Sequence, residues 1–219
     1  MPERRTAAAA LVAVLALLPL AGCGGRPADE GPVANVTIHD DDGLNGVVLP
    51  TPYRLPDVRL DRASGGRYDL RTDANDPLTL VFFGYTNCPD LCQVVMANIA
   101  SSLTRLDPAD RAKVAMVFVT TDPARDTGPV LRSYLSRFDR SFDGLTGDLA
   151  SIVRLGRAFD VQIAKGRRLA SGGYDVEHGT QVVGVLPDGR APFVWTEGTD
   201  PAALTGDIRT ILDDKVPDL

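Results

Sequence analysis

The chain has 219 residues, of which 44% are hydrophobic and 24% are charged. These proportions are typical of a globular protein and exclude a wholly disordered chain or one that crosses a membrane many times. The 29 acidic residues outnumber the 23 basic ones, so the formal net charge is −6. Because the body of the chain carries no basic cluster, nucleic acid is not an expected partner.

The first 22 residues have the features of an export signal. Two arginines near the start precede an uncharged run of 15 residues, Ala7–Ala21. This run is short for a membrane span, which needs about 20 residues. It ends in the letters LAGC at 20–23, and small residues before a cysteine at this place resemble the bacterial lipobox, in which the cysteine is lipidated. We therefore predict a lipoprotein signal peptide over 1–22 and a lipid on Cys23, which would anchor the chain at the extracytoplasmic face of the cell membrane.

Residues 23–50 are rich in Gly, Pro and Asp and are predicted to form a flexible linker, with a short strand near 35–38. His39 lies in this segment and is interpreted as a solvated residue. Residues 51–219 are then predicted to form the folded domain.

The folded part alternates between strands and helices. The run LTLVFFGY at 78–85 is apolar throughout, which is typical of a strand covered on both faces. Apolar spacing predicts a helix from Leu91 to the Asp107-Pro108 stop, and VAMVFVT at 114–120 predicts a second buried strand. Two further helices are expected to begin near Thr127 and after Asp148.

The apolar pattern then changes its period. Gln181–Leu186 and Ala191–Trp195 are predicted strands joined by a turn at Asp188-Gly189, and Pro192 suggests that the second strand lies at a sheet edge. A last helix is expected from Pro201. This order of elements is that of an α/β thioredoxin-like fold with an inserted helix. Weaker strand signals at 53–60 and 67–70 predict an N-terminal hairpin.

If Cys23 carries lipid, Cys88 and Cys92 are the cysteines that remain. In an exported protein such a pair is a structural bridge, a redox pair or a metal site. The pair follows the first core strand, and sites in open α/β sheets gather at the carboxyl ends of strands. We expect Pro89 at the first helical position, both cysteines on one helix face, and a lower pKa for Cys88 than for Cys92 because Cys88 is nearer the helix N-terminus.

The spacing allows both a disulfide and an open dithiol. A structural disulfide would close a loop of three residues and stabilise the chain little, whereas two thiolates suit a soft ion such as Cu(I). Beyond the linker, the remaining histidine is His178, just before the strand at 181–186. In a thioredoxin-like fold the segment entering that strand runs beside the dithiol, so the histidine can converge with the two cysteines.

Three blocks, FFGYTNCPDLC, TTDPARDT and DVEHGTQVVGVLPDG, resemble the Sco/SenC family of copper chaperones for cytochrome c oxidase. The resemblance covers most of residues 50–215 and implies a thioredoxin-like fold in a membrane-tethered, extracytoplasmic protein. It implies one copper ion, as Cu(I) or Cu(II), held by Cys88, Cys92 and His178. The implied partner is the copper-bearing subunit of the oxidase or another copper protein, and the implied role is maturation of its copper centre.

Two residues depart from the usual family pattern. Gln93 stands where proline is common after the second cysteine, and Glu177 stands where aspartate is common before the histidine. Neither removes a proposed ligand. In the TTDPARDT block, Asp122 and Arg125 are interpreted as turn and cap residues, with the alternative that they orient the site or meet a partner.

Two functions stay open at this point. One is a metallochaperone, which is not an enzyme. The other is a thiol-disulfide oxidoreductase that uses Cys88 and Cys92 as a redox disulfide and reduces the cysteines of a partner protein. The three-residue spacer and the position of His178 favour the chaperone, because a general thioredoxin-type enzyme is expected to carry C-x-x-C and a proline in the neighbouring loop.

Overall fold

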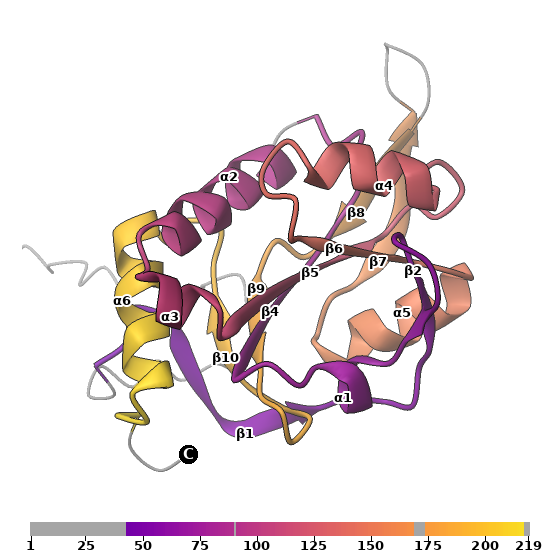
Figure 1. The fold of residues 1–219 in the computed structure, drawn as a ribbon. Coiled ribbons are helices and arrows are strands. Elements are labelled where there is room, and N and C mark those ends of the chain that lie inside the picture. The colour runs from indigo at the N-terminus through magenta and orange to yellow at the C-terminus, as the bar shows by residue number, and fades with distance from the viewer. Residues whose placement is uncertain (1–42, 90, 169–173, 217–219) are drawn as a thin grey trace, which may run out of the picture. The chain divides into compact units, whose positions relative to one another are not determined.

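The structure is a computed structural model that describes residues 43–89, 91–168 and 174–216 (Figure 1). The predicted signal peptide, Cys23, the expected strand at 35–38 and His39 lie outside the described residues. Among the residues it does describe, no helix is long and apolar enough to cross a membrane.

An eight-stranded mixed sheet forms the centre of the fold, in the order β1-β10-β9-β4-β5-β6-β2-β3. The strands β4, β5 and β6 are parallel neighbours, whereas β9 runs antiparallel to both β4 and β10. A separate antiparallel pair, β7 and β8, projects from one end of the fold (Figure 1). The strands are β1 (Val47–Arg54), β2 (Leu60–Arg62), β3 (Arg67–Tyr68), β4 (Leu78–Gly84), β5 (Val114–Thr120), β6 (Asp143–Thr146), β7 (Ile163–Arg168), β8 (Tyr174–His178), β9 (Val182–Val185) and β10 (Arg190–Trp195).

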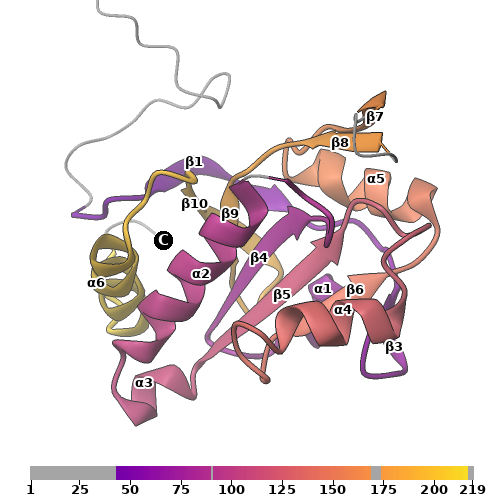
Figure 2. The same cartoon turned by 90° about the horizontal axis from the view of Figure 1, so that it is seen from above.

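Helices cover both faces of the sheet, as the views from two directions show (Figure 2). Apolar side chains of α2, α4 and α6 join one core cluster, and those of α1 and α5 join another. The helices are α1 (Leu70–Asp73), α2 (Leu91–Thr104), α3 (Pro108–Arg111), α4 (Gly128–Leu135), α5 (Leu149–Ala158) and α6 (Pro201–Leu212). This layered α/β arrangement agrees with the predicted thioredoxin-like fold.

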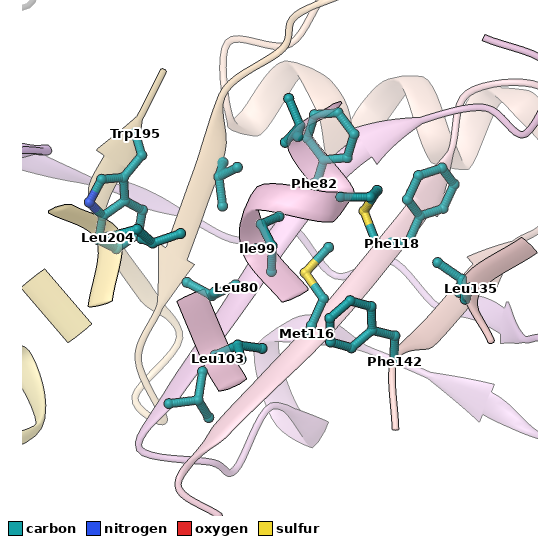
Figure 3. Close-up of a cluster of buried hydrophobic side chains, with 14 of the residues drawn as sticks. Leu80, Phe82, Ile99, Leu103, Met116, Phe118, Leu135, Phe142, Trp195 and Leu204 are labelled. Carbon is teal, nitrogen blue, oxygen red and sulfur yellow. The ribbon is translucent and has the colours of Figure 1, made fainter. Parts of the chain in front are cut away.

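The central strands are buried on both faces, which explains their continuous apolar sequence. All seven residues of β4 are buried, and alternate side chains point to opposite clusters. The cluster under α2, in which apolar chains from distant segments interdigitate, is drawn in Figure 3. Its labelled members are Leu80, Phe82, Ile99, Leu103, Met116, Phe118, Leu135, Phe142, Trp195 and Leu204.

The position of Pro192 corrects one expectation. Its strand β10 does not lie at the edge, because β1 pairs with its outer side. The register between the two strands shifts from the Val48–Phe193 pair to the Tyr53–Ala191 pair, so Pro192 lies at the irregular part of the ladder. A proline without an N–H group is therefore tolerated inside the sheet.

The N-terminal part also differs from the prediction. Residues 47–50, assigned to the linker, begin β1, so the folded part starts earlier than residue 51. A hairpin is present, but it joins β2 to β3 through the Leu60–Tyr68 pair, and the segment near Tyr53 pairs with β10 instead. The strands β6, β7 and β8 were not predicted from the apolar pattern, because they are short or carry several charged residues.

The buried carboxylate of Asp207 in α6 fastens the start of the folded chain. It is 1% exposed and accepts hydrogen bonds from the backbone N–H of Asn45 at 2.9 Å and of Gly46 at 2.9 Å. The side chains of Asn45 and Trp195 also donate to it, each at 2.8 Å. Four donors around one carboxylate balance the cost of burying its charge.

We predict that Asp207→Asn lowers the free energy of unfolding by about 2–4 kcal/mol. The NH2 group of the new asparagine would face N–H donors and cannot accept hydrogen bonds from them. Denaturant unfolding measures this change. The matched control is Asp213→Asn, at an exposed residue that pairs with Lys215, which should change stability by less than about 0.5 kcal/mol. Equal losses of stability in the two variants would contradict this role of the Asp207 carboxylate.

Candidate metal centre

The loop after β4 is fastened to the end of β5. The backbone N–H and the hydroxyl of Thr86 donate to the Asp126 carboxylate at 2.9 Å and 2.6 Å. The hydroxyl of Thr120, the last residue of β5, donates to the same carboxylate at 2.7 Å. Asp126 is fully buried, so this network fixes the position from which the chain enters the cysteine motif.

The two cysteines are not both on the helix, which corrects the sequence prediction. Cys88 lies in a turn in which its N–H donates to the Tyr85 carbonyl at 3.2 Å. The helix α2 begins at Leu91, so Pro89 precedes it and Cys92 is its second residue.

His178 reaches the cysteines from the other sheet. It is the last residue of β8 and pairs with Ile163 of β7. Its Nε2 lies 3.5 Å from Cys92 Sγ, and its Nδ1 lies 2.8 Å from the carbonyl oxygen of Gly179. A carbonyl only accepts, so Nδ1 carries the proton and Nε2 directs its lone pair toward Cys92. A carbonyl partner of this kind fixes the tautomer of a metal-binding histidine.

Aromatic rings hold the imidazole in place. The His178 ring meets Tyr85 edge-on at 5.8 Å and Phe82 edge-on at 6.3 Å between ring centroids. The guanidinium of Arg125 lies 5.7 Å from the centroid of the Tyr85 ring and forms an ion pair with the buried carboxylate of Asp122. Arg125 thus lies beside a ring that also contacts His178, in keeping with the alternative that this turn helps to orient the site.

The three predicted ligands converge. One ligand atom from each of Cys88, Cys92 and His178 lies within 4.8 Å of the others, a separation that a single ion can bridge. Both cysteines are free thiols. Two sulfurs and one imidazole nitrogen are the donors that a soft ion such as Cu(I) prefers.

The two thiols differ in their surroundings. Cys92 is fully buried, whereas Cys88 is partly exposed. The pKa of Cys92 is raised, first by its hydrogen bond with Cys88, then by burial and by the negative charge of Cys88. Cys88 is therefore the sulfur that meets incoming reagents or partners, and Cys92 is the sulfur held inside.

Sequence analysis did not find the residues that support the ligands. Tyr85 and Phe82 were assigned to the strand, and Asp126 to a helix start. The block TTDPARDT was the available signal, because it follows β5 and so had to lie on the rim beside the cysteines. The spacing alone could not show that Asp126 points back to Thr86.

We predict that Cys88 is alkylated at least about tenfold faster than Cys92 when the reduced chain meets iodoacetamide at pH 8, because only the thiolate reacts and Cys92 is buried with a raised pKa. Mass spectrometry of the peptides as a function of time measures both rates. Unfolding the chain in denaturant is the control and should make the two rates alike. Faster alkylation of Cys92 than of Cys88 in the folded chain would contradict the assignment of Cys88 as the accessible sulfur.

Comparisons with known proteins agree with this geometry. The SCO1/SenC family model matches residues 64–213. A protein of Stutzerimonas stutzeri that is named for copper binding is 30% identical over 148 residues, which cover 68% of this chain and 72% of the relative. The mitochondrial protein SCO2 of Saccharomyces cerevisiae is 29% identical over 145 residues, which cover 66% of this chain but only 46% of the relative.

Two solved structures have the same fold. The solution structure of apo Sco1 from Thermus thermophilus has a TM-score of 0.68 at 26% identity and covers 79% of this chain and 99% of its own. The copper-bound ScoI of Bradyrhizobium japonicum has a TM-score of 0.64 at 28% identity and covers 72% and 99%. The family model spans more than half of the sequence, and its range includes the cysteine motif, the Asp122–Arg125 turn and His178. The chain therefore belongs to the SCO1/SenC family.

Proposed function

We propose that the protein is a copper chaperone: it binds one copper ion through Cys88, Cys92 and His178 and delivers it to the copper centre of a cytochrome c oxidase or of another copper protein. The observation that carries the proposal is the convergence of two free thiols and an imidazole lone pair within 4.8 Å. A soft donor set of this kind suits Cu(I), and the nitrogen makes the site suitable for Cu(II) as well.

The unequal exposure of the ligands suits delivery. Cys92 is fully buried, whereas Cys88 and His178 are both half-buried. A ligand of an acceptor protein would reach Cys88 before Cys92 and replace its sulfur first. Copper would then pass by exchange of one bond at a time, without release into water.

The relatives support the same function. One relative is named for copper binding, and one structure of the same fold, at 28% identity, is described as having copper bound. The oxidase as the destination follows from the family resemblance of the three sequence blocks. Membership of the family and the geometry of the site thus favour copper as the cargo.

The membrane anchor is the second part of the proposal. The LAGC sequence at 20–23 supports lipidation of Cys23 after removal of residues 1–22, which would hold the domain at the extracytoplasmic face. Residues 1–22 contain Arg4, Arg5 and Glu3, so the mature chain has 21 basic and 28 acidic residues and a net charge of −7. This charge opposes adsorption on an anionic membrane surface, so attachment would depend on the lipid chains.

A thiol-disulfide oxidoreductase is the second candidate. The observation that favours it is the hydrogen-bonded pair of free thiols, one of them partly exposed, which could reduce a partner's disulfide and become a disulfide itself. Such a reaction has no need of a nitrogen lone pair beside Cys92. The position of His178 therefore favours the chaperone.

We expect the reduced full chain to bind one Cu(I), and the oxidised chain to bind none tightly, because a disulfide offers no thiolate. Cys88→Ala and Cys92→Ala should abolish binding of both copper ions. His178→Ala should weaken Cu(II) strongly and Cu(I) less, and should remove the sulfur-to-copper charge-transfer absorption, because Cu(II) depends more on nitrogen donors. Equilibrium dialysis against copper, with thiols counted before and after, measures the series.

The control for the histidine is His39→Ala, which should change neither affinity. A disulfide-reduction assay on the same variants separates the two functions. His178→Ala should keep reductase activity but should fail to support oxidase assembly if the protein is a chaperone. Wild-type affinity for Cu(II) in His178→Ala would contradict the three-ligand site and favour the reductase.

For the anchor, we expect Cys23→Ser to leave the membrane fraction or to stay unprocessed, since serine has no thiol to accept the lipid. Membrane fractionation and the mass of the N-terminal peptide measure the outcome. A variant that is cleaved after residue 22 and remains membrane-bound like the wild type would overturn the lipidation of Cys23.

A further inference from the structure

Exposed apolar side chains gather at one rim of the central sheet. Among the described residues, the large apolar side chains that are exposed are Leu91, Val94, Val130 and Leu149. Each lies in the first turn of a helix that follows a parallel strand: α2 follows β4, α4 follows β5 and α5 follows β6. Parallel strands end at the same rim of a sheet, so the four side chains share the rim toward which the arrows of β4 and β5 point (Figure 2).

An apolar pocket lies at the same rim. It has a volume of about 170 Å³, and its lining includes residues 121–124 after β5, Leu149 at the start of α5, and Ile163 and Val176 of the β7–β8 pair. Ile163 pairs with His178, so the pocket adjoins the strands that carry the third ligand. A cavity of about 150 Å³ can hold a benzene ring, so this pocket has room for one large apolar side chain.

The metal ligands lie at this rim as well. Leu91 directly precedes Cys92 in α2, and Val94 follows it by two residues. Cys88 and His178 are half-buried. A protein that takes copper from them must bring its own donor atoms to the ion, and its surface then covers the neighbouring side chains. The copper acceptor is therefore the molecule that meets this rim during transfer.

We propose that Leu91, Val94, Val130, Leu149 and the pocket form a docking rim for the copper acceptor. The acceptor would present apolar side chains around its own metal ligands, and one large apolar side chain would enter the pocket. The inference rests on the proposed function and deepens it, because it names the surface that recognises the acceptor.

The chemistry of the docking rim suits this use. The centres of protein interfaces are apolar and poor in charge, and large side chains that fill pockets supply most of the binding energy. An apolar contact around the ligands would also exclude water while copper is exchanged. A second copy of the chain is a less suitable occupant, because it would cover the ligands from which copper has to leave.

The test measures Cu(I) transfer from the reduced, loaded full chain to the purified, copper-free oxidase subunit. The double variant Val94→Gln/Leu149→Gln makes both side chains polar without adding charge, and glutamine is a good helix former. The second-order rate constant of transfer should fall about tenfold, because apolar surface is no longer buried on docking. A small chromophoric chelator needs no docking surface and should remove Cu(I) from the variant and the wild type at equal rates.

The matched control is Ala109→Gln. Ala109 is exposed in α3, which directly precedes β5 and so lies at the opposite end of that strand. Its variant should transfer copper like the wild type. In a titration of the metal-free chain with the same subunit, the NMR amide signals of Val94, Val130 and Leu149 should shift, and that of Ala109 should not. Shifts confined to other parts of the chain would overturn the inference.

The remaining outcomes separate the inference from the proposed function. Wild-type transfer by the double variant would overturn the docking rim and leave the chaperone intact. Slower removal by the chelator would also overturn it, because the substitutions would then act on the copper site itself. A wild-type dimer in light scattering that becomes a monomer in the double variant would assign the rim to a second copy. A wild-type chain that binds copper but does not transfer it to the subunit would overturn the proposed delivery and the inference together.

Discussion

The contact between Cys92 and His178 is the constraint on which the site depends. The two residues are 86 positions apart and belong to different sheets and layers, yet Sγ and Nε2 lie 3.5 Å apart. Cys92 is held by α2 against the central sheet, and His178 is held at the base of the β7–β8 pair. The third ligand, Cys88, lies in the turn before α2, within 4.8 Å of both atoms.

Rigidity comes from the core on one side and from polar networks on the other. The strand β4 is buried throughout, so its end is a fixed point. The loop that leaves it is tied by Asp126 to β5, and Arg125, paired with Asp122, lies 5.7 Å from the centroid of the Tyr85 ring that contacts His178. The ligands thus need little rearrangement to meet an ion, which lowers the entropic cost of binding it. Cys88 lies in a turn and is half-buried, as His178 is, whereas Cys92 is fully buried.

Much of this arrangement could be predicted from the sequence. The strands at 78–84 and 114–120 were predicted nearly to the residue, because both are continuous apolar runs buried on two faces. The helices at 128–135, 149–158 and 201–212 begin after Thr127, Asp148 and Asp200, and the side chains of the two aspartates accept hydrogen bonds from the first turn of their helices. The convergence of His178 with the cysteines followed from the topology of the fold.

Other features depend on long-range contacts that leave no periodic pattern. Pro192 indicates an edge strand unless its register shift with β1 is known. The spacing of Cys88 and Cys92 predicts that both lie on one helix, whereas Cys88 lies in a turn before α2. The tautomer of His178 depends on one carbonyl, that of Gly179, whose direction the sequence does not specify.

X-ray absorption at the copper edge tests the central claim most directly, because it counts the atoms bound to the metal. In the reduced full chain loaded with one Cu(I), the account predicts two sulfur neighbours and one imidazole nitrogen. His178→Ala should lose the nitrogen and keep both sulfurs. A spectrum with fewer than two sulfurs, or a nitrogen that persists in His178→Ala, would contradict the account.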